Sequence, residues 1–199
     1  MEVDIQIKVN GIYHLTDARY FAAHEVNYLG FCIDEDQPNH CSVQKIKEIV
    51  SWLEGPTYVL ETNQPLSMDK IVFYMEETGI SFFHLGKEVV DFPILPQITY
   101  FKDVLISQLS NKTLNDIHFP VILIEDLENS LNKNTIDMLQ SFCRTKTCFL
   151  DIPNHNPDDL IMVAQQIKAS GLIFHGGDEE KTGIKNYDVM DEFFERLDS

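Results

Sequence analysis

The sequence has no long hydrophobic run. No apolar stretch approaches the roughly 18 residues that a membrane-spanning helix needs. The first nine residues, MEVDIQIKV, are acidic and have the character of a strand, unlike the basic and then apolar start of a signal peptide. We therefore expect a cytoplasmic protein that does not insert into a membrane.

Basic residues are scarce. The chain has 15 Lys and Arg against 32 Asp and Glu, which gives a formal net charge of −17 over 199 residues. This charge repels the phosphate field on which binding to nucleic acid or to an anionic membrane depends, so we expect neither partner. A phosphate ligand is still compatible with it, because backbone N–H groups at loops and helix starts bind phosphate without any basic side chain.

Several motifs of cofactor and metal proteins are also missing. The four cysteines, at positions 32, 41, 143 and 148, form no C-x-x-C pair, so we expect reduced thiols in or near the core. No G-x-G-x-x-G follows the first strand-like run, which gives no support to a dinucleotide site. There is no internal repeat and no linker rich in Pro and Gly. With 44% hydrophobic residues, residues 1–199 are expected to form a single domain.

Short β-rich runs alternate with amphipathic helical patterns along the chain. The expected strands are 5–10, 28–33, 57–62, 81–85, 94–99, 121–125, 148–152 and 172–175. The expected helices are 16–26, 42–54, 67–78, 101–116, 129–144, 157–169 and 187–197. Ser42 and Ser67 are suited to cap helices, and Pro157 suits the first helical position. The segment after the fourth strand, 87–93, is too short for more than a turn.

This alternation predicts parallel strands joined by crossover helices, and therefore an α/β fold. Eight such units favour closure into one (β/α)8 TIM barrel, small and compact, with a weak or missing helix after strand 4. An open doubly wound sheet is the alternative.

The motifs at both ends of the chain resemble those of phosphoribosylanthranilate isomerases, enzymes of tryptophan biosynthesis. IKVNGI, residues 7–12, resembles the family's first strand end, K-x-C-G-I, and YLGF, residues 28–31, resembles its A-x-G-F. NPDDL, residues 156–160, resembles N-P-E-N-V, and HGGDEEKTGIK, residues 175–185, resembles S-S-G-V-E-x-x-P-G-x-K. The resemblance implies the same barrel fold, a small phosphorylated substrate and no cofactor.

The resemblance also implies that the family's proton-transfer groups are missing. The Amadori rearrangement of this family uses a cysteine at the end of the first strand and an aspartate at the end of the sixth. Asn10 stands at the cysteine position, and an amide can orient a substrate but cannot take its proton. Ile124 aligns with the aspartate, although a slip of one or two residues would bring Glu125 or Asp126 there.

The binding groups of the family are altered as well. The arginine that holds the anthranilate carboxylate aligns with Asn39, and the glycine pair after the seventh strand is replaced by Pro153-Asn154. The glycine pair after the eighth strand, Gly176-Gly177, is retained. We therefore expect any phosphate contact at Gly176, Gly177 and the adjacent His175, with Lys8 as a further ligand-binding residue.

Titratable residues fall at several expected strand ends, where a barrel builds its active site: Asp34, Glu61, His84, Glu125, Asp151 and His175. They are compatible with a replacement acid and base, with a divalent-metal site, or with an ordinary polar rim, and we assign no metal. His84 aligns with a glutamine in the family's V-Q-L-H-G strand and should point into the barrel.

Two hypotheses remain. In the first, the protein is an isomerase of this family, with Asn10 orienting the substrate and His84, Glu125 or Asp126 transferring protons. In the second, the barrel is non-catalytic and binds a ligand or another protein. We favour loss or change of the ancestral activity, with a small molecule, phosphorylated or not, bound at the barrel mouth of a monomer or homodimer.

Overall fold

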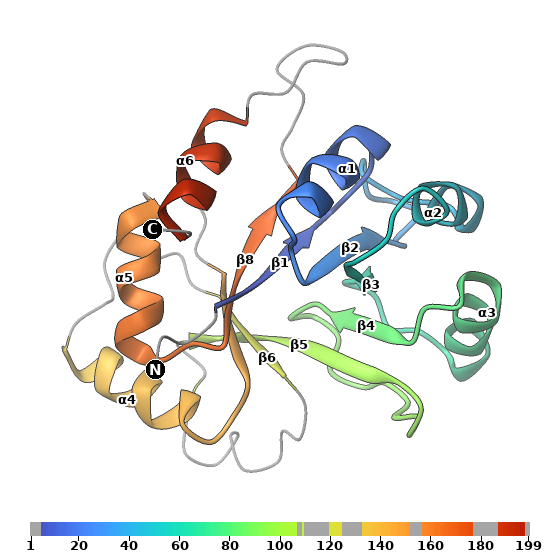
Figure 1. The fold of residues 1–199 in the computed structure, drawn as a ribbon. Coiled ribbons are helices and arrows are strands. Elements are labelled where there is room, and N and C mark those ends of the chain that lie inside the picture. Colours follow the sequence, from blue (N-terminus) through green and yellow to red (C-terminus); the bar gives the residue numbers. More distant parts are fainter. Residues whose placement is uncertain are drawn as a thin grey trace.

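The fold is a closed barrel of eight parallel strands. The computed structural model describes residues 5–106, 109, 120–124, 133–151, 157–176 and 187–197. Neighbouring strands pair in sequence order, and β1 pairs with both β2 and β8, which confirms the predicted (β/α)8 barrel (Figure 1). The strands are β1 Gln6–Asn10, β2 Tyr28–Cys32, β3 Thr57–Thr62, β4 Phe82–Leu85, β5 Thr99–Leu105, β6 Val121–Ile124, β7 Cys148–Asp151 and β8 Gly171–His175.

Helices surround the barrel. In the described residues they are α1 Leu15–Ala23, α2 Val43–Val50, α3 Met68–Thr78, α4 Lys133–Cys143, α5 Pro157–Ile167 and α6 Asp188–Leu197 (Figure 1). The predicted caps of α2 and α3 are confirmed: the hydroxyls of Ser42 and Ser67 accept hydrogen bonds from the backbone N–H groups of Lys45 and Lys70, each at 3.3 Å. Across the described ranges, every helix is too short or too polar to cross a membrane.

The fifth strand differs from the prediction. A strand over 94–99 was expected, followed by a helix over 101–116, but β5 occupies Thr99–Leu105. Proline at positions 93 and 96 disfavours a strand there because it donates no ladder hydrogen bond. Within β5, Phe101 and Asp103 point into the barrel. An apolar and a charged residue therefore share the inward face, and the sequence lacks the alternation that is typical of a strand. Residues 86–98 contain no helix, which confirms the expected gap after β4.

An apolar layer inside the barrel forms the floor of its mouth. It consists of Val59, Phe101, Phe149 and Ile173, with Tyr28 and Phe82 packed against them. The rings of Phe101 and Phe149 meet edge to face at 5.5 Å between their centroids. Side chains two positions apart on a strand share a face, so the next inward residue on each strand lies above this floor. On β3, β4, β5, β7 and β8 those residues are polar, namely Glu61, His84, Asp103, Asp151 and His175, whereas β2 has Gly30 at this level.

Candidate functional site

A polar cavity of about 280 Å³ lies at the mouth of the barrel, at the carboxyl ends of the strands. Its carboxylate and imidazole side chains are those of Glu61, His84, Asp103, Asp151 and His175. All five side chains are carried by strands, which hold them more rigidly than loops would. This is the face on which barrels of this type place their active sites.

Carboxamides make up much of the remaining wall. Asn10, Gln37, Asn39 and Asn63 line the cavity, and each offers both a hydrogen-bond donor and an acceptor. Asn39, which aligns with the family's arginine, reaches the mouth beside Gly11: a Cβ on Gly11 would lie 2.9 Å from its Nδ2. The wall therefore contains a neutral group where the family pattern has a cation.

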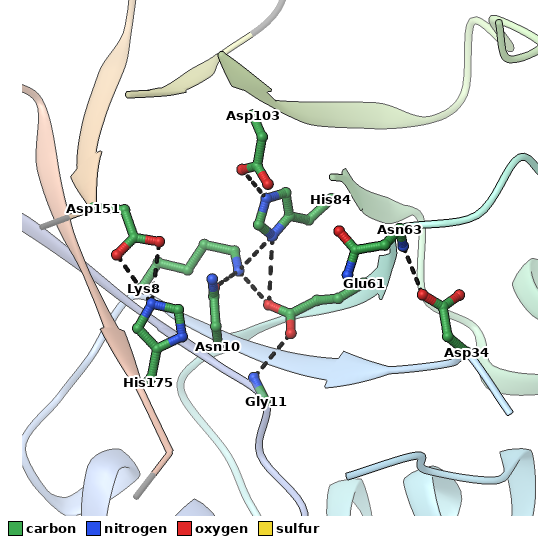
Figure 2. A network of polar contacts seen from close by, with 10 residues as sticks. All are labelled: Lys8, Asn10, Gly11, Asp34, Glu61, Asn63, His84, Asp103, Asp151 and His175. Atoms are coloured by element: carbon green, nitrogen blue, oxygen red, sulfur yellow. Dashed lines mark hydrogen bonds and ion pairs between the residues drawn. The ribbon is translucent and has the colours of Figure 1, made fainter. Parts of the chain in front are cut away.

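Lys8 is buried below the cavity, and its ammonium group has three partners. Nζ donates to Oδ1 of Asn10 and, at 2.5 Å, to Oε1 of Glu61, and it lies 3.3 Å from Nδ1 of His84 (Figure 2). Asn10 and Glu61 therefore use two of its three N–H donors, and the role of the contact with His84 depends on which ring nitrogen carries a proton. The expected contact between Lys8 and a ligand stays a prediction.

Glu61 joins β3 to β1. Its Oε2 accepts a hydrogen bond of 2.8 Å from the backbone N–H of Gly11 (Figure 2). Burial alone would raise the pKa of Glu61, but the charge of Lys8 and the contact with His84 outweigh it and lower the pKa to about 2. Glu61 is therefore an anion at neutral pH, and its role is to hold Lys8 and Gly11.

His84 on β4 is paired with Asp103 on β5. Nε2 of His84 lies 2.6 Å from Oδ1 of Asp103, and both side chains are almost fully buried (Figure 2). Burial lowers the pKa of His84, but the charge of Asp103 and contacts with Asp103 and Glu61 outweigh burial and raise it. Sequence reasoning missed Asp103 because it placed β5 too early. The β-favouring residues Tyr100, Phe101 and Val104, which flank Lys102 and Asp103, were the signal.

A second histidine and carboxylate pair lies on β7 and β8. Nε2 of His175 lies 2.9 Å from Oδ1 and 3.1 Å from Oδ2 of Asp151 (Figure 2). Its hydrogen bond with Asp151 raises the pKa of His175, against the opposite effect of burial. The His175 side chain is 56% exposed while that of Asp151 is 8% exposed. The imidazole is thus accessible and oriented by a fixed carboxylate.

Asp34, also expected at the mouth, has a different set of partners. Its carboxylate accepts a hydrogen bond of 2.6 Å from the backbone N–H of Asn63 (Figure 2). It accepts another, of 2.5 Å, from the Thr62 hydroxyl. It therefore stabilises the turn that follows β3 and does not take part in the cluster around Lys8.

The structure brings Asn10, His84 and His175 together around the cavity, and Asn10 and His175 are paired in register on β1 and β8. The backbone N–H of Gly176 donates to the carbonyl oxygen of Asn10 at 2.7 Å. The other predicted site residues, Glu125, Asp126 and Gly177, lie outside the described residues. Within the described ranges, no group of three His, Cys, Asp or Glu side chains is arranged to hold a metal ion.

No protein-family model and no curated protein matches the sequence. Solved structures do match over nearly the whole chain. The phosphoribosylanthranilate isomerase of Thermus thermophilus superposes with a TM-score of 0.73 at 18% identity, covering 98% of each chain. A monomeric form of the dimeric phosphoribosylanthranilate isomerase of Thermotoga maritima gives 0.69 at 19% identity, covering 98% of this chain and 99% of that one.

A third match is a phosphoribosylanthranilate isomerase in complex with reduced 1-(o-carboxyphenylamino)-1-deoxyribulose 5-phosphate. Its TM-score is 0.70 at 18% identity, and 98% of each chain is covered. These likenesses confirm the structural resemblance expected from the sequence motifs. At such identities they establish the fold alone.

Proposed function

We propose that the chain is a divergent member of the phosphoribosylanthranilate isomerase family that has lost the Amadori isomerase reaction and binds a small molecule, phosphorylated or not, at the barrel mouth. The observation that carries this proposal is the contact between Asn10 and Lys8. At the position of the family's cysteine stands an amide whose oxygen accepts from a buried ammonium group.

This contact supports loss of the ancestral reaction for two reasons. The Asn10 amide has no accessible pKa and cannot act as a base. Its oxygen is also bound to Lys8, which leaves the NH₂ group free to orient a ligand. The second group is affected as well if Ile124, the last residue of β6, takes the position of the family's aspartate, because isoleucine carries no acid. The neighbouring alternatives, Glu125 and Asp126, lie outside the described residues.

The polar wall supports retention of a ligand site. Apolar side chains would be the simplest filling for an unused barrel mouth, yet this mouth is lined by three carboxylate, two imidazole and four carboxamide side chains. Removing so many polar groups from bulk water costs free energy unless they are paired with one another or with a ligand. We propose that the residues left facing the cavity, Asn10, Asn39 and His175 among them, contact this ligand.

Complementation of a tryptophan auxotroph that lacks this isomerase tests the loss of activity. The native chain is expected not to support growth. Asn10→Cys is the matched variant, because a thiol beside the Lys8 ammonium would have a lowered pKa and could serve as a base. Growth with the native chain would overturn the proposal, and an authentic isomerase expressed from the same vector is the positive control.

A thermal-shift screen tests the ligand site with inorganic phosphate, sugar phosphates, free sugars and divalent metal ions as probes. A probe that binds the folded state stabilises it, by about 2.7 kcal/mol at a concentration of 100 Kd. We expect a higher midpoint with at least one probe in the native chain, and a smaller change in Asn39→Ala. An unchanged midpoint with every probe would favour the alternative, a non-catalytic protein-interaction barrel.

The remaining expectations form part of the same proposal. We propose that residues 1–199 act as one barrel, without a cofactor, in the cytoplasm. The Thermotoga maritima relative is described as dimeric, and its monomeric form was obtained separately, so both a monomer and a homodimer are compatible with this fold. Light scattering of the purified chain distinguishes the two.

A further inference from the structure

We infer that Asp103 and His175 are the base and the acid of a second chemistry in this mouth: the isomerisation of a small α-hydroxycarbonyl compound. The inference rests on the proposed function, because it concerns the same ligand site. It assigns that site a reaction that uses neither of the family's proton-transfer positions.

The two groups come from well-separated strands of one ring. Asp103 lies on β5 and His175 on β8, and three steps separate these strands in the closed order of eight. Both side chains line the same cavity. A ligand held between them would therefore meet a carboxylate on one side and an imidazole on the other (Figure 2). Proton transfer at two adjacent atoms of one molecule needs this arrangement.

Each group is oriented by a hydrogen-bonded partner: the carboxylate by an imidazole, and the imidazole by a carboxylate. Oδ1 of Asp103 is bound by Nε2 of His84 at 2.6 Å, and Nε2 of His175 is bound by Asp151 at 2.9 Å. A carboxylate can only accept, so Nε2 carries the proton in both rings. These contacts leave Oδ2 of Asp103 and Nδ1 of His175 without a hydrogen-bond partner among the described residues. His84 and Asp151 are positioning residues in this scheme.

The lining also identifies the class of substrate. The described residues around the cavity include no Lys or Arg, and the buried Lys8 is engaged by Asn10 and Glu61, so we assign an uncharged reacting end to the ligand. The carboxamides of Asn10, Asn39 and Asn63 suit hydroxyl and carbonyl groups. A volume of about 280 Å³ lies at the lower end of the range for small-molecule sites.

The residues that line the cavity give less support to covalent catalysis by a nucleophile. Cys32 is the thiol that lines the cavity, and burial raises its pKa to about 11, so it is protonated at neutral pH. Proton transfer by Asp103 and His175 requires no such nucleophile.

The reaction is balanced without any other reactant. The Asp103 carboxylate removes the proton from the hydroxyl-bearing carbon next to the carbonyl, and the C–H electron pair forms a carbon–carbon double bond. The carbonyl π electrons move to oxygen, which takes a proton from the His175 imidazolium to give an enediol. Asp103 then returns its proton to the former carbonyl carbon while His175 accepts one from the other hydroxyl. One carbon is reduced as its neighbour is oxidised.

Hydrogen exchange in D₂O, followed by proton NMR, tests this inference. The probes are dihydroxyacetone and D-ribulose in one arm, and dihydroxyacetone phosphate and D-ribulose 5-phosphate in the other. The native protein is expected to replace the α-hydrogen of at least one probe by deuterium faster than buffer does. The two arms then show whether the ligand carries a phosphate.

The variants decide which residues act. Asp103→Asn and His175→Gln should each slow exchange by about 100-fold or more, the usual range for loss of a general acid or base. Asp151→Asn should move the pH profile of exchange to lower pH, an effect that a purely structural role would not produce. His175 lies on the exposed rim, so His175→Gln is expected to fold, and an unchanged thermal midpoint checks this.

His24→Gln is the matched control. His24 also lies near a carboxylate, 3.7 Å from Asp191, but on the helical shell of the barrel. Exchange should be unaffected by this change. Exchange that persists in both Asp103→Asn and His175→Gln would overturn the inference. A probe that raises the thermal midpoint without exchanging would also overturn it and leave the proposed function intact, whereas absence of any binding would remove both.

Discussion

Gly30 on β2 leaves the space that the carboxylate of Glu61 on β3 occupies. A Cβ at Gly30 would lie 1.8 Å from Oε1 of Glu61, far inside van der Waals contact. The same Oε1 accepts from the buried ammonium of Lys8 at 2.5 Å. The absence of one side chain on β2 thus allows the ion pair between β1 and β3 to form.

Gly30→Ala is therefore expected to destabilise the protein by about 1–3 kcal/mol, the usual cost of overpacking a core. Urea denaturation measures the change. The matched test is the same substitution in a Glu61→Ala background, where the colliding carboxylate is gone and alanine at position 30 should cost much less. Equal losses in both backgrounds would contradict this account of Gly30.

Loss of Lys8 should be costly because it leaves Glu61 buried without its cation. We expect Lys8→Met to lower the free energy of unfolding by about 3–5 kcal/mol, and the double variant Lys8→Met/Glu61→Gln to recover part of that loss. The control is Lys47→Met, which breaks an exposed ion pair of 3.4 Å with Glu77 and should cost less than about 1 kcal/mol. Similar losses at the two lysines would argue against a strong buried pair.

The stability contributed by Glu61 should depend on acid pH. Its pKa is lowered from 4.5 to about 2 by Lys8 and His84 against the effect of burial, so the contribution is complete above pH 4.5 and is lost as the pH falls through about 2. This corresponds to roughly 3 kcal/mol at neutral pH. The difference in unfolding free energy between the native chain and Glu61→Gln should shrink over that interval, whereas Glu77→Gln should show little change.

The stability contributed by the pair of His175 and Asp151 should be lost at high pH, in contrast to that of Glu61. The pKa of His175 is raised in the folded state, so its contribution is complete below the ordinary histidine pKa of about 6.5 and is lost as the pH rises through the raised value. Asp151→Asn should therefore destabilise more at pH 5.5 than at pH 9, as measured by chemical denaturation at both pH values.

Asp36→Asn provides the comparison for that measurement, because Asp36 accepts from the amide of Gln64 at 2.9 Å and has no histidine partner in the described residues. Its effect should be the same at both pH values. An NMR titration that placed the midpoint of His175 below 6.5 would contradict the predicted sign.

Much of the barrel could be predicted from local patterns. Thr57–Thr62 was expected as a strand and is observed with the same ends, and Ser42 and Ser67 cap the helices that they were expected to cap. These features depend on side chains a few residues apart, which a sequence shows directly. The strand at Thr99–Leu105 was misplaced because its inward positions hold both Phe101 and Asp103. The charge of Asp103 is explained by its contact with His84, which the sequence does not show.

The sequence by itself determined the alternation that closes the barrel, and it placed an amide, Asn10, at the end of the first strand, where the motif that it resembles has a cysteine. The tertiary structure decided what surrounds that amide. Glu61 and His84 lie 53 and 76 positions after Lys8 along the chain, yet both contact its ammonium group. Local periodicity tells which face of a strand a residue occupies, whereas contacts across a barrel depend on the pairing and register of all its strands.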